Sequence, residues 1–467
     1  GLADVEAKRQ LFEQARADGT LAWRLLRACD LWTAAFFSVK RRVERQGRER
    51  TPTSDIVWRF LADPTSLQAH VAEETEALRQ QYRFFHWPLE FPEVFKRGGF
   101  SLVLGNPPWE TMSPDAKEFF AKHEPDIAGM TPAQQQTRIA ELLALPAIRD
   151  EWERHARELY AAVRFVKESG RYRMFAAGNL GKGDFNVYRQ FAELALSFAA
   201  PDGVAAQIVP ENFYNGANAS AIRASLLRDF RVSSLFGFEN ARGVWFAAID
   251  TRMKFALYCA CRGGPTTEIP AAFAVSSEGR LQAAREQPLQ LPVSLLREFS
   301  PDALAVMEFS NQLEINVARK MYSRFPRLGD EVEGLPTWVP ATEVHMGNDN
   351  DLFESDARGW PLYQGSMVTH HDYRAKGYLT GHGRNVTWEP LVFGSPAKLI
   401  RPQWRIHPDQ IPSKTRDRVT RYRIGFCDVG NATNQRALMA ALIPPKTVCG
   451  HKVPTIEFDP HDPAVMM

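Results

Sequence analysis

An apolar run that ends at two consecutive prolines constrains this chain more than any other feature. Residues 100–105 (Phe-Ser-Leu-Val-Leu-Gly) predict a buried strand, and Asn106-Pro107-Pro108-Trp109 follow directly. Proline fixes φ and offers no N–H to the ladder of a sheet, so the strand must stop there. Open α/β sheets bind ligands just outside the carboxyl ends of their strands. We therefore predict that residues 106–109 form a rigid, exposed strand end at a binding site.

The tetrapeptide has the chemistry to receive a planar amine. The side-chain oxygen of Asn106 and the carbonyl oxygen of Pro107 can accept both hydrogens of an exocyclic amino group. These bonds draw the nitrogen toward tetrahedral geometry and free its lone pair for attack, so the proton can leave afterwards without a general base. Trp109 can stack on the ring that carries the amine. A plain proline-rich turn after a core strand is the alternative interpretation.

Asn-Pro-Pro-aromatic after a hydrophobic strand resembles the catalytic motif of amino-methyltransferases that use S-adenosylmethionine, above all the DNA adenine N6-methyltransferases. Protein-glutamine and some RNA methyltransferases carry the same tetrapeptide. Further segments, in the same order, resemble large methyltransferases of restriction-modification and phage-defence systems, of the type IIG-like, DISARM-like or BREX-like kind. These segments are residues 85–95 and 98–100 before the motif, and 181–188, 191–198, 204–210, 243–255, 345–374 and 422–445 after it.

The resemblance implies an α/β fold of the class I S-adenosylmethionine-dependent methyltransferases. That fold is a Rossmann-like doubly wound sheet, here with helical insertions and a C-terminal α+β target-recognition domain. The implied cofactor is S-adenosylmethionine, and the implied partners are double-stranded DNA and other defence-system subunits. Asn106, Pro107, Pro108 and Trp109 would act on N6 of an adenine everted from the duplex, because a stacked and paired base cannot be reached. Asn rather than Ser at the first position favours adenine over cytosine N4 without excluding it.

Three later residues are implied to bind the substrate. Phe246 would line the side of the base opposite Trp109, by its place in the family's late motif. Asn186 and Tyr188 would lie beside the active site, next to a glycine-containing loop at residues 178–183. That loop does not have the spacing of a dinucleotide-binding motif, and a surface loop without a role is equally consistent with it.

Two basic clusters are candidates for phosphate contacts, which position DNA without reading its sequence. The first, at residues 40–50, is at least as typical of a solvated face. The second contains Lys414, Arg416 and Arg418 and lies in the implied recognition region, where Arg374 is a further candidate. The net charge of +2 does not by itself argue for nucleic acid, so DNA contacts would depend on such local clusters.

The sequence departs from the family in its first hundred residues. Family members bind the methyl donor on a glycine-rich loop that precedes the Asn-Pro-Pro motif, and residues 1–105 contain no such loop. We therefore expect this chain to be the later part of a longer enzyme, and its donor-binding residues stay unknown. The alternative is a catalytically silent DNA-recognition subunit of a defence complex.

The chain divides into four predicted parts. Residues 1–85 are predicted to be helical, and alternating helix and strand patterns over 86–262 predict the catalytic domain, with a helical insertion at 114–169. Residues 263–335 are predicted to be a connector. Residues 336–467, with scattered Pro, Gly, Trp and Asn, are predicted to be a target-recognition domain that is incomplete here.

Several classes of protein are disfavoured. The five cysteines form no C-x-x-C pair, and His370-His371-Asp372 has no third ligand at a standard spacing, so no metal site is predicted. No apolar stretch is long enough to span a membrane, and no signal peptide is recognisable. With 467 residues and 44% hydrophobic side chains, the chain can bury substantial cores. We therefore expect a cytoplasmic enzyme with no membrane partner.

Overall fold

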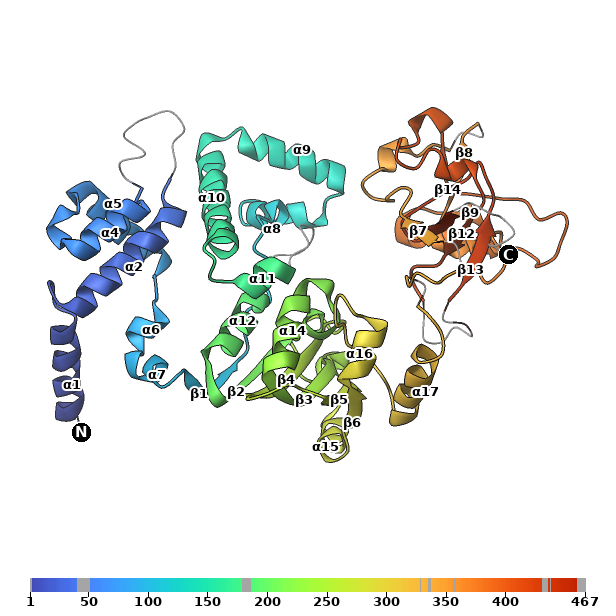
Figure 1. The fold of residues 1–467 in the computed structure, drawn as a ribbon. Coiled ribbons are helices and arrows are strands. Elements are labelled where there is room, and N and C mark those ends of the chain that lie inside the picture. Colours follow the sequence, from blue (N-terminus) through green and yellow to red (C-terminus); the bar gives the residue numbers. More distant parts are fainter. Residues whose placement is uncertain are drawn as a thin grey trace. The chain divides into compact units, whose positions relative to one another are not determined.

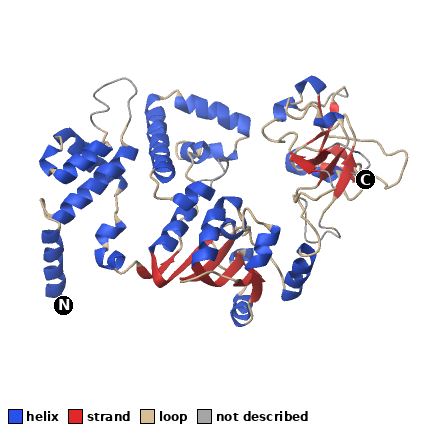
Figure 2. Cartoon of the chain, in the orientation of Figure 1, coloured by secondary structure: helices blue, strands red, loops and turns tan. Residues whose placement is uncertain are grey.

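The computed structural model describes residues 2–39, 51–178, 186–327, 329–334, 337–355, 358–430, 436 and 438–459. The chain forms two compact units, Gly1–Arg324 (unit 1) and Phe325–Met467 (unit 2), each of which is described by itself. Helices dominate the first part of unit 1, and short strands joined by long loops dominate unit 2 (Figures 1 and 2). None of the helices within these described ranges has both the length and the apolar character needed to cross a membrane.

The N-terminal part of unit 1 is helical, as its sequence predicted. Thr20 and Thr53 each accept a hydrogen bond from the backbone N–H three residues on and so cap the helices that follow them. Ala28, Leu31, Phe60 and Val71 form a small core among these helices. The basic cluster at residues 40–50 lies outside the described residues. The helices are α1 (Leu2–Ala15), α2 (Leu21–Phe37), α4 (Ser54–Ala62), α5 (Ala69–Tyr82), α6 (Trp87–Glu90) and α7 (Pro92–Lys96).

A mixed six-stranded sheet forms the centre of unit 1. Its strand order is β1-β2-β4-β3-β5-β6, with β1 parallel to β2 and β3 parallel to β5, while β4 runs antiparallel to both of its neighbours. The carboxyl ends of β1, β2 and β3 therefore share one edge with the start of β4. The strands are β1 (Phe100–Gly105), β2 (Ala199–Pro210), β3 (Phe230–Glu239), β4 (Lys254–Arg262), β5 (Glu268–Val275) and β6 (Leu289–Pro292).

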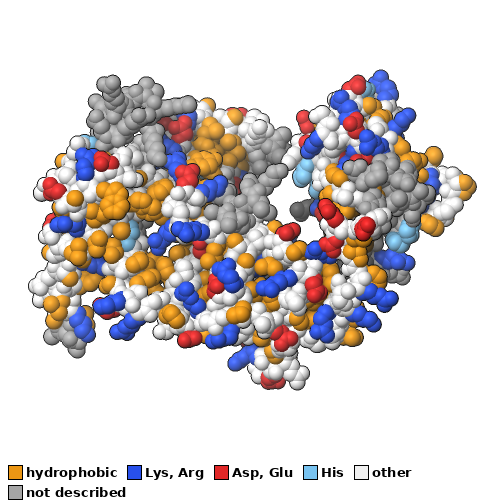
Figure 3. All heavy atoms as spheres, in the orientation of Figure 1, with side chains coloured by type: hydrophobic (Ala, Val, Ile, Leu, Met, Phe, Trp, Pro, Cys, Tyr) orange, Lys and Arg blue, Asp and Glu red, His pale blue; other side chains and the backbone are white. Residues whose placement is uncertain are grey.

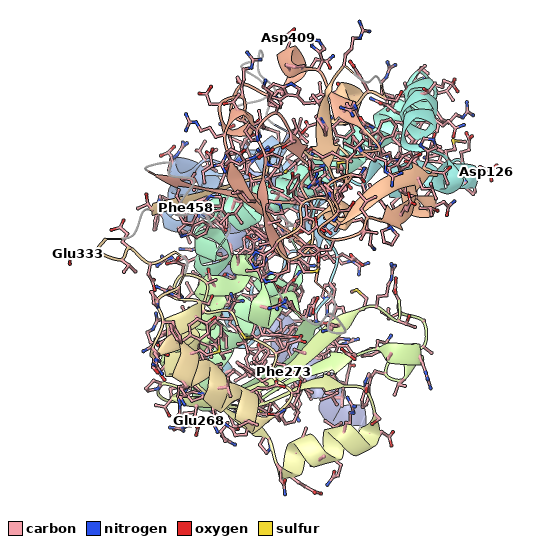
Figure 4. The ribbon with its side chains drawn as sticks, turned by 90° about the vertical axis from the view of Figure 1, so that its right-hand side faces the viewer. Asp126, Glu268, Phe273, Glu333, Asp409 and Phe458 are labelled. Atoms are coloured by element: carbon pink, nitrogen blue, oxygen red, sulfur yellow. The ribbon has the colours of Figure 1, made fainter. Side chains whose placement is uncertain are left out.

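Helices cover the two faces of this sheet unequally. The larger core lies between the sheet and α12 (Tyr188–Phe198), α14 (Ser220–Asp229), α16 (Val293–Phe299) and α17 (Gln312–Tyr322). The opposite face packs against α15 (Glu278–Glu286), which lies on the other side of the strands in Figure 1. Phe273 of β5 lies among the strands in Figure 4. The centroid of its ring lies 5.9 Å from that of Tyr214.

The prediction that residues 263–335 form a connector is wrong for the first half of this segment. Its first half belongs to the sheet, because β5 pairs in parallel with β3, and β6 pairs antiparallel with β5. A proline-rich composition suggested a linker, but Pro270 lies within β5 and Pro292 ends β6. β6 is the edge strand of the described sheet, where a proline is tolerated. Pro270 lies near the start of β5, before the pairing of β5 with β3 begins at Ala271.

A helical insertion separates β1 from β2, as predicted for residues 114–169. Its main helices are α8 (Ala116–Ala121), α9 (Pro132–Leu143) and α10 (Pro146–Glu168), and they enclose a core of their own with Phe119, Phe120, Ile127 and Leu142 buried. Thr131 and Gln134 form a capping box at the start of α9. The short helices α11 (Arg173–Gly178) and α13 (Asn212–Asn215) lie before α12 and after β2.

Unit 2 is built from short strands around a buried ion pair. Arg423 and Glu343 are both fully buried and bonded to each other, and Glu343 also accepts the N–H of Cys449 at 2.7 Å. The larger sheet has the order β13-β12-β15-β7, and β11-β8-β14 and β10-β9 form smaller ones. The strands are β7 (Thr337–Ala341), β8 (Trp360–Tyr363), β9 (Lys376–Thr380), β10 (Thr387–Pro390), β11 (Arg405–Ile406), β12 (Arg423–Phe426), β13 (Ala440–Ile443), β14 (Val448–Cys449) and β15 (Thr455–Asp459).

Candidate active site at the end of strand β1

The strand before the tetrapeptide is an edge strand, which corrects the predicted buried strand. β1 pairs with β2 alone among the described strands, and its other side carries no ladder partner there. Leu102 and Leu104 are 55% and 73% exposed, while Val103 packs against the larger core. One face of β1 is therefore covered and the other is open.

The tetrapeptide itself forms an exposed strand end. Asn106 and Pro108 are exposed, Pro107 is buried and Trp109 is half-buried. Asn106, Pro107 and Pro108 line a cavity of about 430 Å³ together with apolar side chains of β1 and α12. The carboxamide of Asn106 is therefore accessible from a cavity, as the predicted chemistry requires.

Asn186 holds the backbone of the tetrapeptide. Its Nδ2 donates to the carbonyl oxygen of Trp109 at 2.8 Å, and the N–H of Val187 donates to the carbonyl oxygen of Glu110 at 2.9 Å. The side-chain oxygen of Asn186 accepts the N–H of Tyr188 at 3.3 Å. Both the nitrogen and the oxygen of the Asn186 side chain therefore bond to the protein backbone, and the nitrogen does so at the tetrapeptide.

The prediction that Tyr188 binds substrate is corrected by its burial. Tyr188 is 2% exposed and belongs to the larger core of unit 1, at the start of α12. Burial raises the pKa of its hydroxyl to about 12. An aromatic ring on the apolar face of a helix packs into the core, and its hydroxyl gave no sequence signal to the contrary. Most of the neighbouring loop at residues 178–183 lies outside the described residues.

Trp109 and Phe246 meet around a third aromatic ring that the sequence did not single out. The ring centroid of Phe255 lies 6.1 Å from Trp109 and 5.2 Å from Phe246. The indole Nε1 of Trp109 is buried and has no hydrogen-bond partner in the described part of the chain. The structure therefore brings Phe246, one of the predicted substrate-binding residues, close to the tetrapeptide.

Asn240 organises the loop that carries Phe246. It is 1% exposed, and its side-chain oxygen accepts the N–H groups of Trp245 and Phe246 at 3.2 and 3.0 Å. Its Nδ2 donates to the carbonyl oxygens of Phe246 and Ile249 at 2.9 and 3.2 Å. Sequence reasoning missed this residue, although an Asn directly after a strand, with Gly243 three residues on, is a turn signal.

A cluster of ionisable groups lies at the same edge of the sheet. Lys254, at the start of β4, lies 2.9 Å from Glu308 and 3.6 Å from Glu239. The hydroxyl of Tyr214 donates to Glu308 at 2.6 Å. Burial raises the pKa of the nearby Glu211 carboxyl. The sequence did not predict this cluster, because its members come from four separate segments.

The basic residues predicted to contact DNA have different surroundings in unit 2. Arg418 is 8% exposed and donates to the carbonyl oxygen of Val339 at 3.0 Å, so the predicted phosphate contact is corrected. Arg374 is half-buried, donates to the carbonyl oxygen of Lys398 and stacks on Tyr373, which also places it inside the unit. Arg416 is exposed but bonded to two backbone carbonyls. Lys414 is exposed and available.

The surface does not show a single basic field on the face drawn in Figure 3. Lys and Arg side chains there are interspersed with acidic and hydrophobic ones over the helices and the sheet. This mixture agrees with the small net charge of the whole sequence. Any contact with DNA phosphates would depend on local groups of basic residues.

The described residues do not make a complete site for S-adenosylmethionine. The cavity beside Asn106 is lined mainly by aromatic and aliphatic side chains, and no carboxylate is among its lining residues. Gln207, which also lines it, donates to the carbonyl oxygen of Phe191 and accepts the hydroxyl of Tyr258. The polar and charged parts of the cofactor would therefore lack most of their partners on these residues.

One family of known proteins matches part of the chain. Residues 35–134 match the family described as Eco57I restriction-modification methylase, and the match includes the whole of β1 and the tetrapeptide. No curated protein matches the chain.

Solved structures are similar only at a distance. The "DrdV-DNA complex" is 11% identical and has a TM-score of 0.36, with 83% of this chain and 37% of that one covered. The "type IIG restriction endonuclease BpuSI" is 11% identical with a TM-score of 0.26, covering 95% and 66%. The "type I restriction enzyme EcoKI M protein" is 12% identical with a TM-score of 0.24, covering 68% and 92%. The chain spans 38% of the length of a further structure, titled as a complex of "the type I R-M system". The match to the family therefore identifies residues 35–134 as similar to restriction-modification methylases.

Proposed function

We propose that this chain carries the catalytic motif of a site-specific DNA methyltransferase of a restriction-modification or phage-defence system. The proposed reaction transfers a methyl group to N6 of an adenine that has been everted from double-stranded DNA. The observation that carries the proposal is the Asn106-Pro107-Pro108-Trp109 segment at the end of β1. Asn106, Pro107 and Pro108 line a cavity of about 430 Å³, and the segment lies inside the region matching restriction-modification methylases. Under this proposal the protein acts in the cytoplasm.

The strand end would orient the amino group of the base. The side-chain oxygen of Asn106 and the carbonyl oxygen of Pro107 accept its two hydrogens, and the prolines hold both acceptors in a fixed direction. This positioning directs the nitrogen lone pair out of the plane of the ring and supplies much of the rate. The proton leaves the nitrogen once the new bond has made it cationic, so these residues need no base before attack.

Aromatic side chains would hold the everted base. Trp109 provides one face for stacking, and Phe246 lies close to it across Phe255. Asn186 supports this arrangement from behind through its bond to the carbonyl oxygen of Trp109. The role proposed for Asn186 is therefore positioning of the motif.

S-adenosylmethionine is the proposed methyl source, and it would supply an electrophilic methyl group. The residues lining the cavity beside Asn106 do not complete a site for it. Unit 2 is proposed to contact the duplex, with Lys414 as the exposed candidate for a phosphate. Other subunits of a defence system are proposed as further partners.

Single-molecule sequencing of host DNA, with and without the intact gene, tests the proposal directly. We expect N6-methyladenine at one sequence motif only when the gene is present. Asn106→Ala should remove that mark, because the first acceptor of the amino group is lost, whereas Gln282→Ala on the exposed surface of α15 removes an amide without effect. Methylation that persists in Asn106→Ala cells would refute the assignment.

The second candidate is a DNA-recognition subunit without activity of its own. It is favoured by one observation, the lack of carboxylates among the residues that line the cavity. A silent subunit would bind DNA and leave it unmodified, so the same sequencing experiment would show no difference between cells with and without the gene.

A further inference from the structure

The loop between β3 and β4 presents aliphatic side chains to solvent. Val244 is 51% exposed, Ile249 is 44% exposed and Met253 is 39% exposed. These three residues lie within residues 240–253, which we call the β3–β4 loop. Each of these side chains is partly covered by the protein and partly in water, and a partner surface could cover the exposed part of all three.

The β3–β4 loop is held in one conformation. Four hydrogen bonds join the buried side chain of Asn240 to the backbone of Trp245, Phe246 and Ile249. The indole of Trp245 donates to the carbonyl oxygen of Val275, which anchors the loop to β5. The exposed side chains therefore sit on a support that would not have to be ordered when a partner binds.

The loop lies at the same edge of the sheet as the tetrapeptide. β1 runs parallel to β2, and both β2 and β3 run antiparallel to β4. The carboxyl ends of β1 and β3, at Gly105 and Glu239, therefore lie at the same edge of the sheet. Two strands lie between them, which corresponds to roughly 14 Å at the usual strand spacing. Phe246 links the two places, because it shares Phe255 with Trp109.

Basic side chains flank the aliphatic ones. Arg242 is exposed at the start of the loop, and Arg252 is exposed near its end, where it pairs with Asp250 at 2.6 Å. An exposed pair of this kind contributes little and opens readily when a phosphate competes for the guanidinium. Aliphatic residues between two arginines match a duplex, which offers a stacked interior between two phosphate backbones.

We propose that the β3–β4 loop enters the duplex and fills the space that the everted base leaves. Val244 and Ile249 would replace the lost stacking between neighbouring base pairs, and Arg242 and Arg252 would contact the phosphates on either side. This inference rests on the proposed function, since it requires a base to leave the stack. The proposed partner of the loop is double-stranded DNA at the position of the everted base, and the loop stabilises the everted state.

The test measures base eversion with 2-aminopurine in place of the target adenine, because its fluorescence rises when it leaves the stack. The full protein carrying Val244→Ala and Ile249→Ala should give a fluorescence rise roughly tenfold smaller than the unmodified protein, since the wedge is lost. The matched control is Leu313→Ala with Val317→Ala on α17, which removes aliphatic groups that are 69% and 49% exposed. The control should match the unmodified protein.

A second measurement separates loss of the wedge from loss of folding. Opposite an abasic site the target base is unpaired and leaves the stack more easily. On a duplex with this abasic site, the double variant should recover the full fluorescence rise when the target base is 2-aminopurine. It should recover the full methylation rate when the target base is adenine, since 2-aminopurine has no 6-amino group to methylate. A misfolded protein would do neither. The inference would be overturned if variant and unmodified protein gave equal fluorescence on the paired 2-aminopurine duplex and equal methylation of the paired adenine duplex. If the unmodified protein methylates no host DNA at all, the proposed function fails instead.

Discussion

At the scale of single residues, the site depends on the indole of Trp109, which is half-buried against the core and follows the residues that line the cavity. Trp109 packs on Phe255 while the neighbouring Asn106 and Pro108 are exposed. Its buried Nε1 has no partner among the residues that the structure describes, which costs stability unless a ligand or solvent satisfies it. A side chain in this position serves both packing and substrate binding.

Replacement of Trp109 should therefore separate two effects. Trp109→Phe keeps an aromatic plate and should lower kcat/KM only a few-fold, whereas Trp109→Ala should lower it roughly tenfold to a hundredfold through lost stacking. Steady-state kinetics on the recognised DNA measures this, and urea denaturation of both variants shows how much comes from lost packing. Equal kinetics for the two variants would argue against a stacking role.

The sequence predicted correctly that the strand ends before the two prolines, but it could not say which neighbouring polar side chains are buried. Two prolines force a strand to end, and that local constraint holds in any fold. Tyr188, Arg418 and Arg374 were misjudged because each is amphipathic, with a long apolar part that can pack inside. Phe255, Asn240 and Glu308 were missed since only the folded chain brings them to the site.

At the scale of elements, β1 shows how far an apolar pattern can be interpreted. Its run of apolar residues predicted a strand covered on both faces, but Leu102 and Leu104 are exposed. An apolar pattern shows which side chains are hydrophobic, but it does not show whether the described residues bury them. The helices around it were easier to predict, because α12 and α9 have periodic apolar faces and α9 also begins with a capping box.

A pair of stacked histidines links two segments of unit 2 and makes that link sensitive to pH. The rings of His345 and His451 lie 4.2 Å apart, and the Nδ1 of His451 accepts the N–H of Met346 at 3.1 Å. Burial, followed by the nearby His345, lowers the pKa of His451 from 6.5, while Lys452 and Asp428 act in opposite directions. Since the unfolded segment binds the proton more tightly, the link stabilises above about pH 6.5 and weakens as the pH falls below it.

Hydrogen–deuterium exchange can follow this link in the full protein. Peptides containing residues 344–350 should lose protection between pH 7.5 and 5.5 after correction for the intrinsic exchange rate. In His451→Gln, whose amide oxygen can accept the same N–H without titrating, the protection should change little over this range. The histidine link would be ruled out as the cause if both proteins responded equally to pH.

At the scale of the whole molecule, each unit has its own core. The larger core of unit 1 and the clusters of unit 2 share no residues, and the ion pair of Arg423 with Glu343 is fully buried in unit 2. Breaking such a pair leaves an uncompensated charge inside the protein, which costs about 3–5 kcal/mol. The consequence should be confined to one unit.

Scanning calorimetry of Glu343→Gln should show this confinement. We expect two unfolding transitions, of which only one moves to lower temperature in the variant, because the core of unit 1 is unaffected. A single transition that shifts as a whole would mean that the units unfold together. Lys320→Gln, on an exposed helix of unit 1, is the matched charge-removing control and should leave both transitions in place.

The open side of β1 has a practical consequence for anyone who handles this polypeptide. Among the described strands, β1 has no ladder partner on its outer side, and two leucines protrude there. A strand with such an open side is a template onto which foreign or identical chains can add, and native proteins usually shield such edges. The purified chain should accordingly be prone to precipitation. A solubility measurement would then show, before any enzymatic assay, whether a partner protein that covers this edge of β1 is present.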